Sequence, residues 1–178
     1  MNQFKALFSA IALCAAAGTA SAQTSVSVTG RITMTPCSIS AAPVDMGKVP
    51  FNDIIANSGA APDKYGRDVV ITLGGCRLSA LSSAALTFSS PTTTAGFRLA
   101  LNSGPGAAEG FAIMLTTNDP VHAPSTRPVY FGPGVDYPFN VDSNKSTFIF
   151  RAGYVRDGSS TVKPGVANAM ATVTVSYT

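Results

Sequence analysis

The feature that most constrains the fold is a regular alternation of apolar and hydroxyl-bearing side chains over residues 168–178. One face of this segment carries Ala169, Ala171, Val173, Val175 and Tyr177. The opposite face carries threonine and serine, with Met170 as the exception. A period of two places alternate side chains on opposite faces of a strand. The segment therefore predicts a β-strand that is buried on one face only.

Shorter stretches of the same kind recur along the chain. Residues 146–157 place Phe148, Phe150, Ala152 and Tyr154 on one face. Further strands are predicted at residues 68–73, 85–89, 97–101, 111–117, 129–131 and 137–141. Glycine-rich turn sequences separate them, for example at residues 74–75 and 132–134. Many short strands without a convincing long helix predict an all-β sandwich.

The first 22 residues have the composition of an export signal. Lys5 supplies a positive charge, residues 7–17 are apolar or small apart from Ser9, and Ala20-Ser21-Ala22 fits a signal-peptidase site. We therefore expect a mature chain of 178 − 22 = 156 residues that begins at Gln23. That length suits a single domain. The apolar run is too short to span a membrane.

Two cysteines remain after the signal, Cys37 and Cys76. In an oxidising compartment such a pair most often forms a disulfide, and two buried free thiols are the alternative. The loop-entropy model gives a disulfide across a loop of 76 − 37 = 39 residues a stabilisation of about 4 kcal/mol. Cys14 lies within the signal. A lipid anchor on Cys14 is disfavoured, because Leu13 before it is larger than the residue that usually precedes a lipidated cysteine.

Composition argues against nucleic-acid binding and catalysis. The mature chain has a formal charge of 11 − 9 = +2 and no block of like charge, so we expect no nucleic-acid partner. His122 is the only histidine, and its proline-flanked stretch predicts an exposed loop. Nucleophile-elbow, zinc-protease and Cys-x-x-Cys motifs are missing, so we expect no catalytic residue, metal site or cofactor, and a small secreted enzyme is disfavoured. Asp136, Asp142 and Asn144 lack the spacing of a calcium loop.

The start of the mature chain predicts a strand of its own. Its apolar face consists of Val26, Val28, Gly30, Ile32 and Met34. Pro36 follows and cannot donate to a strand ladder, so the strand should end just before Cys37. A strand placed ahead of the disulfide-tied body need not belong to the sheet of that body. Gly30 marks either a position where a partner comes close or an ordinary bulge.

Several segments, taken in order, resemble type 1-like fimbrial pilins of the chaperone–usher family. Residues 26–32 resemble the donor strand of that family, and residues 36–39 resemble the start of its first body strand. Residues 44–49 resemble a Val-x-Leu-Gly-x-Val segment, with Met46 in place of leucine. Residues 70–76 resemble the run into the second cysteine, and Pro164-Gly165 with residues 169–177 resembles the C-terminal strand. Residues 92–128 depart from the family, and we expect them to form variable surface.

The resemblance implies an all-β, incomplete immunoglobulin-like sandwich that lacks its final strand. A donor strand from a neighbouring subunit would complete it by β-strand addition. The implied organisation is a cleaved signal (1–22), a donor-strand extension (23–35) and a pilin domain (36–178). The donor residues are Val26, Val28, Gly30, Ile32 and Met34, and the groove and chaperone-contact strand carries Ala169, Ala171, Val173, Val175 and Tyr177.

The same resemblance implies the partners and the location of the protein. A periplasmic pilus chaperone would cover the groove, and an outer-membrane usher would receive the subunit. Neighbouring pilin subunits would then polymerise into a surface fimbria that supports adhesion. The alternative is a minor adaptor or tip subunit that binds a host receptor. Insertion of the tail into the groove of its own chain stays open, because the tether before Cys37 is short but does not forbid it.

Overall fold

The structure is a computed structural model that describes residues 29, 31, 36–57, 60, 63–90, 96–158 and 161–178. The chain divides into two units, Met1–Thr33 and Met34–Thr178. Every helix and strand reported below lies in the second unit. The predicted signal and the predicted donor residues Val26, Val28, Gly30, Ile32 and Met34 lie outside the described residues.

The described part of the chain consists mainly of short strands. The strands are β1 (Ser38–Ala41), β2 (Arg67–Gly74), β3 (Ala84–Ser89), β4 (Leu99–Ala100), β5 (Phe111–Thr117), β6 (Asp136–Pro138), β7 (Thr147–Arg156) and β8 (Thr172–Tyr177). The helical pieces are α1 (Phe51–Ala56), η1 (Asp63–Tyr65), η2 (Leu78–Ala80) and η3 (Val141–Ser143). This composition confirms the predicted all-β class.

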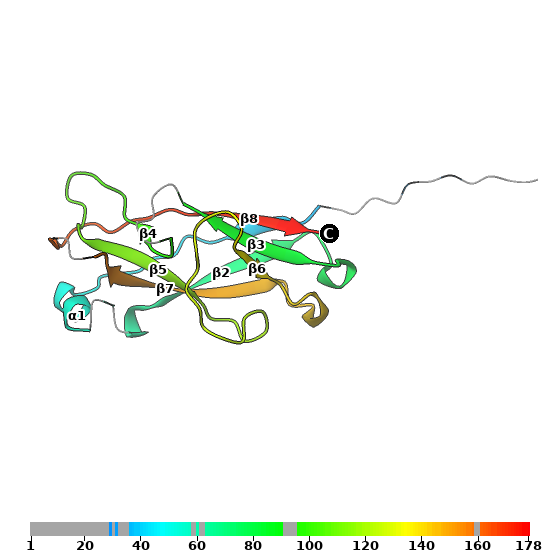
Figure 1. Ribbon diagram of the computed structural model, residues 1–178, viewed down its shortest axis with the longest axis horizontal. Helices are drawn as coiled ribbons and strands as arrows, with labels where there is room; N and C mark the ends of the chain where they lie inside the picture. Colours follow the sequence, from blue (N-terminus) through cyan, green and yellow to red (C-terminus); the bar gives the residue numbers. More distant parts are fainter. Residues whose placement is uncertain are drawn as a thin grey trace, which may run out of the picture. The chain divides into compact units, whose positions relative to one another are not determined.

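The strands form two antiparallel sheets that pack face to face as a sandwich (Figure 1). One sheet has the order β1-β2-β7-β5-β4 and the other has the order β6-β3-β8. Strand β7 is the longest and lies at the centre of the larger sheet, between β2 and β5. The two sheets form a sandwich because the apolar side chains on their inner faces bury each other.

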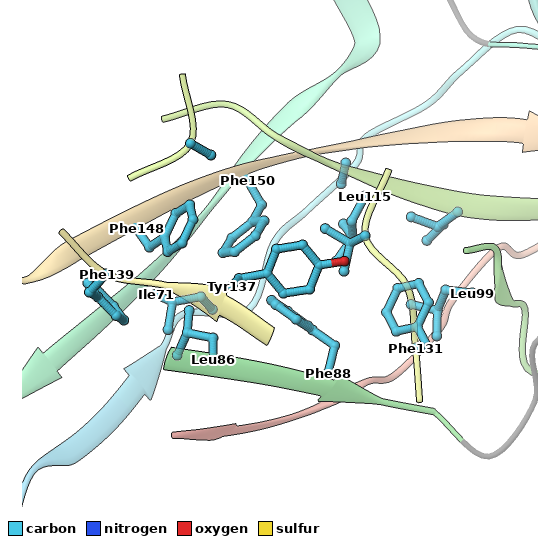
Figure 2. Packing of buried hydrophobic residues seen from close by; sticks show 14 of the residues in the cluster. Ile71, Leu86, Phe88, Leu99, Leu115, Phe131, Tyr137, Phe139, Phe148 and Phe150 are labelled. Carbon is cyan, nitrogen blue, oxygen red and sulfur yellow. The ribbon is translucent and has the colours of Figure 1, made fainter. Parts of the chain in front are cut away.

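An aromatic cluster fills the space between the sheets (Figure 2). Phe148 and Phe150 of β7 are fully buried, and their ring centroids are 4.5 Å apart. Phe88 of β3 meets Phe150 from the opposite sheet at 4.9 Å, edge to face. Tyr137 of β6 packs edge to face on both Phe88 and Phe150. These contacts explain the alternation of residues 146–157, because each inward aromatic side chain removes a large apolar area from water.

Most predicted strands are confirmed, but residues 129–131 do not form one. Strands β2, β3, β5 and β7 lie where the alternation placed them. Of the strand predicted at residues 97–101 only Leu99–Ala100 (β4) forms, and the strand predicted from residue 168 begins at Thr172 (β8), so Ala169 and Ala171 precede it. In residues 129–131 the backbone N–H groups bond to different neighbours. Val129 donates to Leu115 O at 2.8 Å, and Phe131 donates to Gly96 O at 2.6 Å. No ladder with a single partner forms, so this prediction is wrong even though Val129 is fully buried.

Two further expectations need correction. Residues 137–141 contain only the end of β6, because the chain turns into η3 at Val141. The stretch 92–128 was expected to be variable surface, yet it contains β5, which pairs with β7 over seven residues. Phe111, Ile113 and Leu115 of β5 are buried. The reason is tertiary, because β5 fills an inner position of the larger sheet.

The predicted disulfide is confirmed. Cys37 and Cys76 are bonded, with their Cα atoms 5.0 Å apart. They lie just before β1 and just after β2, where the two strands pair in the register Ser38 to Gly74. The bond therefore ties the edge strand β1 to the sheet. Among the described residues, no helix is long and apolar enough to cross a membrane.

Candidate functional site

Strand β8 presents an apolar stripe that is only partly covered. Its residues alternate between exposed and partly buried along the whole strand. The partly buried members pack against the core and continue into the segment before β8: Ala167, Ala169, Ala171, Val173, Val175 and Tyr177. The corresponding inward residues of β7, such as Phe148, are fully buried. We call these six residues the β8 stripe.

The incomplete burial of the stripe follows from the position of β8 at the edge of its sheet. Within the described residues, β8 pairs with β3 alone, and β1 at the edge of the other sheet pairs with β2 alone. Ile39 of β1 and Val44 after it are also partly buried against the core. Each sheet thus ends in a strand with a free edge and apolar side chains that lack full cover. A free edge of this kind is a template for another strand.

A pocket of about 570 Å³ lies where the segment before β8 meets the segment after β1. One wall is formed by residues 164–169 and the other by residues 44–49. Its apolar lining comes from several elements: Met46, Phe51, Ile54, Phe111, Ile113 and Tyr154. We call this feature the end pocket. The sequence placed residues 44–49 and Pro164-Gly165 in recognisable motifs, but only the fold brings the two segments together.

Backbone packing at Gly165 positions one wall of the end pocket. Val166 N donates to Gly106 O at 2.8 Å, and Ala108 N donates to Val166 O at 2.9 Å. A Cβ atom at Gly165 would lie 2.5 Å from Gly106 O. Only glycine permits this approach of two backbones. The hydroxyl of Tyr154 adds a bond of 2.8 Å to Ala167 O and so ties the wall to β7.

Charge is sparse around the end pocket. Asp45 and Lys48 are its only charged lining residues, and both are exposed. Burial raises the pKa of the Tyr154 hydroxyl, and the nearby carboxylate of Asp45 raises it further. The Asp45 charge therefore acts on a group inside the pocket. The site is a cleft with mostly apolar side chains but a mixed polar and apolar surface, and its exposed acid and base mark its mouth.

The prediction that His122 lies on an exposed loop is wrong, because its side chain is buried with 8% exposure. Its Nδ1 accepts a hydrogen bond of 2.9 Å from Asn140 N, so the neutral ring carries its proton on Nε2. The ring packs against Phe139 and Phe148 at 4.9 and 5.1 Å. Burial lowers the pKa of His122, and Asp119 opposes that effect.

Asp119 explains why this loop folds inward. Its carboxylate is fully buried and accepts bonds from Val121 N at 2.9 Å and from Ile149 N at 3.1 Å. Lys145 Nζ lies 3.1 Å from both oxygens. Burial alone would raise the pKa of Asp119, but these donors outweigh it and hold the pKa below its ordinary value. The sequence offered no signal for this role, because Asp119 looks like any other loop aspartate.

Within the described ranges, no three or more His, Cys, Asp or Glu residues are grouped so that they could hold a metal ion. Nδ1 of His122 accepts a backbone N–H, and its buried Nε2 has no hydrogen-bond partner among the described residues. The surface therefore combines a free β-edge, a partly covered apolar stripe and the end pocket, which are the features that β-strand addition uses.

The fold and these free edges define a class, the immunoglobulin-like sandwich whose edge can accept another strand. Similar folds occur in solved pilus subunits. The P pilus rod subunit PapA has 20% identity and a TM-score of 0.61, covering 88% of this chain and all of PapA. A chain from a chaperone–usher pilus structure has 19% identity and a TM-score of 0.57, covering 88% of this chain and 96% of that one. No curated protein matches the chain in sequence.

The sequence family is clear. The model of the fimbrial protein family matches residues 16–178. The chain belongs to the fimbrial protein family, whose members are structural proteins of surface fimbriae.

Proposed function

We propose that this chain is a structural subunit of a chaperone–usher fimbria and that it polymerises by donor-strand exchange. In this scheme the β8 stripe and the end pocket form one groove. The N-terminal strand of a neighbouring subunit fills the groove and completes the sandwich. The role of the protein is mechanical, and no catalytic step is required.

The observation that carries the proposal is the free edge of β8 combined with its half-buried apolar stripe. An isolated sandwich gains nothing from leaving apolar side chains partly exposed beside an unpaired edge, because such an edge promotes aggregation. A strand added there would pair with the free backbone groups and cover the stripe at the same time. Specificity would come from alternate side chains that enter the groove.

The proposed donor strand has a suitable length. From Val26 to Met34 there are 34 − 26 = 8 steps, or about 26 Å at ~3.3 Å per residue. The β8 stripe, from Ala167 to Tyr177, spans 177 − 167 = 10 steps, or about 33 Å on the same scale. The donor face carries four large apolar side chains that can replace water along this length. Gly30 at its centre suits a point where the wall of the groove leaves no room for a side chain.

The free groove must be protected before assembly. A periplasmic chaperone would lend a strand to β8, and an outer-membrane usher would exchange that strand for the tail of the next subunit. The export signal of residues 1–22 and the Cys37–Cys76 disulfide both suit this route. The resulting fimbria would stand on the cell surface and support adhesion.

A substitution in the donor strand tests the proposal. Gly30→Arg should block insertion into a neighbour without harm to the subunit, because the tail lies outside the pilin domain. Chaperone–subunit complexes of this variant should form at the normal yield, while fibres and heat-resistant polymers disappear. Thr29→Arg is the matched control, because Thr29 points to the other face and should tolerate the added side chain.

Two outcomes would count against the proposal. Normal polymers from Gly30→Arg would show that the strand does not enter a tight groove. Loss of the chaperone complex as well would place the strand within the subunit's own sheet. A second arm removes residues 173–178, which should abolish capture by the chaperone and lead to degradation of the subunit. Normal co-purification of that truncated chain would exclude β8 as the accepting edge.

A further inference from the structure

The mouth of the end pocket holds an acidic group without an ion-pair partner. Asp45 is exposed, and its Oδ1 accepts a bond of 2.8 Å from Gly47 N. None of the ion pairs among the described residues includes Asp45. Its carboxylate lies near enough to Tyr154 to perturb the hydroxyl that bonds to Ala167. Asp45 therefore contributes an exposed carboxylate to the lining of the pocket, outside any ion pair of the described residues.

The N-terminal extension carries a single charged side chain. Among residues 23–35 the only ionisable side chain is Arg31, and it is exposed. Arg31 lies between Gly30 and Ile32, on the face opposite the apolar row. Neighbouring residues of a strand point in opposite directions and are about 3.3 Å apart along it. When Ile32 points into a groove, Arg31 therefore points away from the groove, one residue along the strand.

An apolar alternation alone leaves the register of an added strand ambiguous. A slip of one residue turns the apolar face outward, but a slip of two residues keeps apolar side chains in the groove. Val28, Ile32 and Met34 could each enter the end pocket on these grounds, whereas Gly30 has no side chain to fill it. The outer-face residues next to Val28 and next to Met34 are all polar and uncharged. Ile32 differs, because one of its two neighbours is Arg31. Charge complementarity with Asp45 distinguishes these registers.

We propose that Arg31 of one subunit pairs with Asp45 of the next and that this ion pair fixes the register of the donated strand, with Ile32 in the end pocket. The proposal rests on the proposed function, since it needs the strand of a second copy in the groove. A slip of two residues would place Thr29 or Thr33 beside Asp45 and leave the carboxylate unpaired. The pair thus favours one register and a neighbour that carries a basic residue at this position.

Lys48 is the other charge at the mouth, and it bears on the test. It follows Gly47, whose φ of 66° turns the chain between the two charged residues. If Arg31 responded only to the total charge of the mouth, Lys48→Glu would improve assembly as much as Asp45→Arg impairs it. If Arg31 pairs specifically with Asp45, Lys48→Glu should change the rate of assembly clearly less than Asp45→Arg does.

A charge swap in the full exported chain tests the pairing. Arg31→Glu and Asp45→Arg should each slow the formation of heat-resistant polymer by about 2- to 10-fold, the size expected when an exposed ion pair becomes a repulsion. The double variant Arg31→Glu/Asp45→Arg should recover most of the loss. The differences should shrink near 1 M salt, where exposed charges are screened. Asp142→Arg, at an exposed site in η3, makes the same change in net charge and should have no effect.

Cysteine pairs report the register directly. A chain with Arg31→Cys and a second chain with Asp45→Cys should be joined by a short bifunctional thiol reagent, because an Arg–Asp pair can leave the Cα atoms farther apart than the roughly 7 Å that a direct disulfide tolerates. Thr29→Cys or Thr33→Cys combined with Asp45→Cys should cross-link far less. Preferential linkage through residue 29 or 33 would overturn the proposed register.

The results separate this inference from the proposed function. If the unmodified chain polymerises and Gly30→Arg blocks it, but the charge variants assemble at the normal rate, the Arg31–Asp45 pairing is wrong and donor-strand exchange stands. If the unmodified chain forms no polymer, both the pairing and the proposed function are overturned. Recovery in the double variant together with the residue 31–45 cross-link would support both.

Discussion

Substitution of Asp119 should lower the free energy of unfolding strongly, although nothing in the local sequence marks this residue. Its carboxylate is fully buried, and it organises residues 118–127 by accepting bonds from Val121 N and Ile149 N. Lys145 completes the arrangement from the turn before β7. Asp119→Ala would remove every one of these acceptors. Asp119→Asn would keep the shape and one oxygen, but it would lose the charge.

The magnitude follows from the groups left behind. Asp119→Ala leaves two partly buried backbone N–H groups without an acceptor, at a cost of at most about 1–3 kcal/mol each. Lys145 is partly exposed, with 33% of its side chain accessible, so it can turn to water and adds at most about 1 kcal/mol. We expect Asp119→Ala to lower the free energy of unfolding by about 2–5 kcal/mol, most of it from the two N–H groups. Asp119→Asn should cost less, about 1–3 kcal/mol, because one acceptor survives.

Urea unfolding of the purified, disulfide-intact chain would measure these values. The chain has no tryptophan and five tyrosines, so circular dichroism and tyrosine fluorescence are the suitable signals. Asp142→Ala at an exposed position is the control and should change stability by less than about 0.5 kcal/mol. An Asp119→Ala variant within 1 kcal/mol of the unmodified chain, by the same criterion, would refute the assignment of Asp119 as the organiser of this loop.

Three further predictions follow from individual contacts. Gly165→Ala should lower the free energy of unfolding by about 1–3 kcal/mol, because its Cβ would meet Gly106 O at 2.5 Å; Gly153→Ala, which meets open space, is the control, and equal stability of the two variants would contradict the backbone packing. His122 has a folded pKa below its ordinary 6.5, so its contribution to stability is complete above pH 6.5 and is lost as the pH falls through the folded pKa. His122→Phe should therefore flatten the dependence of stability on pH below 6.5, and an unchanged slope would contradict burial of the neutral ring. Cys37 and Cys76 should resist alkylation until reduced, and the Cys37→Ala/Cys76→Ala variant should be about 4 kcal/mol less stable; two thiols that react without reduction would refute the disulfide.

Local pattern was sufficient for β7 at the centre of the larger sheet and for most of β8 at the edge of the smaller one. The alternation of Phe148 and Phe150 predicted β7, and the structure places both residues in the aromatic core. The alternation of residues 169–177 also predicted β8 and its half-buried face. A period of two survives in these strands because one face meets the opposite sheet and the other meets solvent.

Residues 129–131 and His122 show where local pattern fails. Val129 is apolar and buried, as a strand residue would be, but its N–H and that of Phe131 bond to different segments. His122 lies between prolines in a loop, yet the buried carboxylate of Asp119 pulls that loop onto the core. The decisive contacts are distant in sequence. They are Leu115 and Gly96 for residues 129–131, and Lys145 and Ile149 for the Asp119 carboxylate beside His122, so no short window along the chain contains the information.

The sequence by itself determined the class of the protein, because alternation, turn chemistry and two cysteines after an export signal are local properties. It also marked the two strands most relevant to assembly, one at each end of the mature chain. Only the tertiary structure decided that β8 lies at an edge, that residues 44–49 and 164–169 enclose the end pocket, and that Asp45 lies at its mouth. The physical reason is that burial and pairing depend on which segments meet in space, and hydrogen bonds across a sheet connect residues that can be a hundred positions apart.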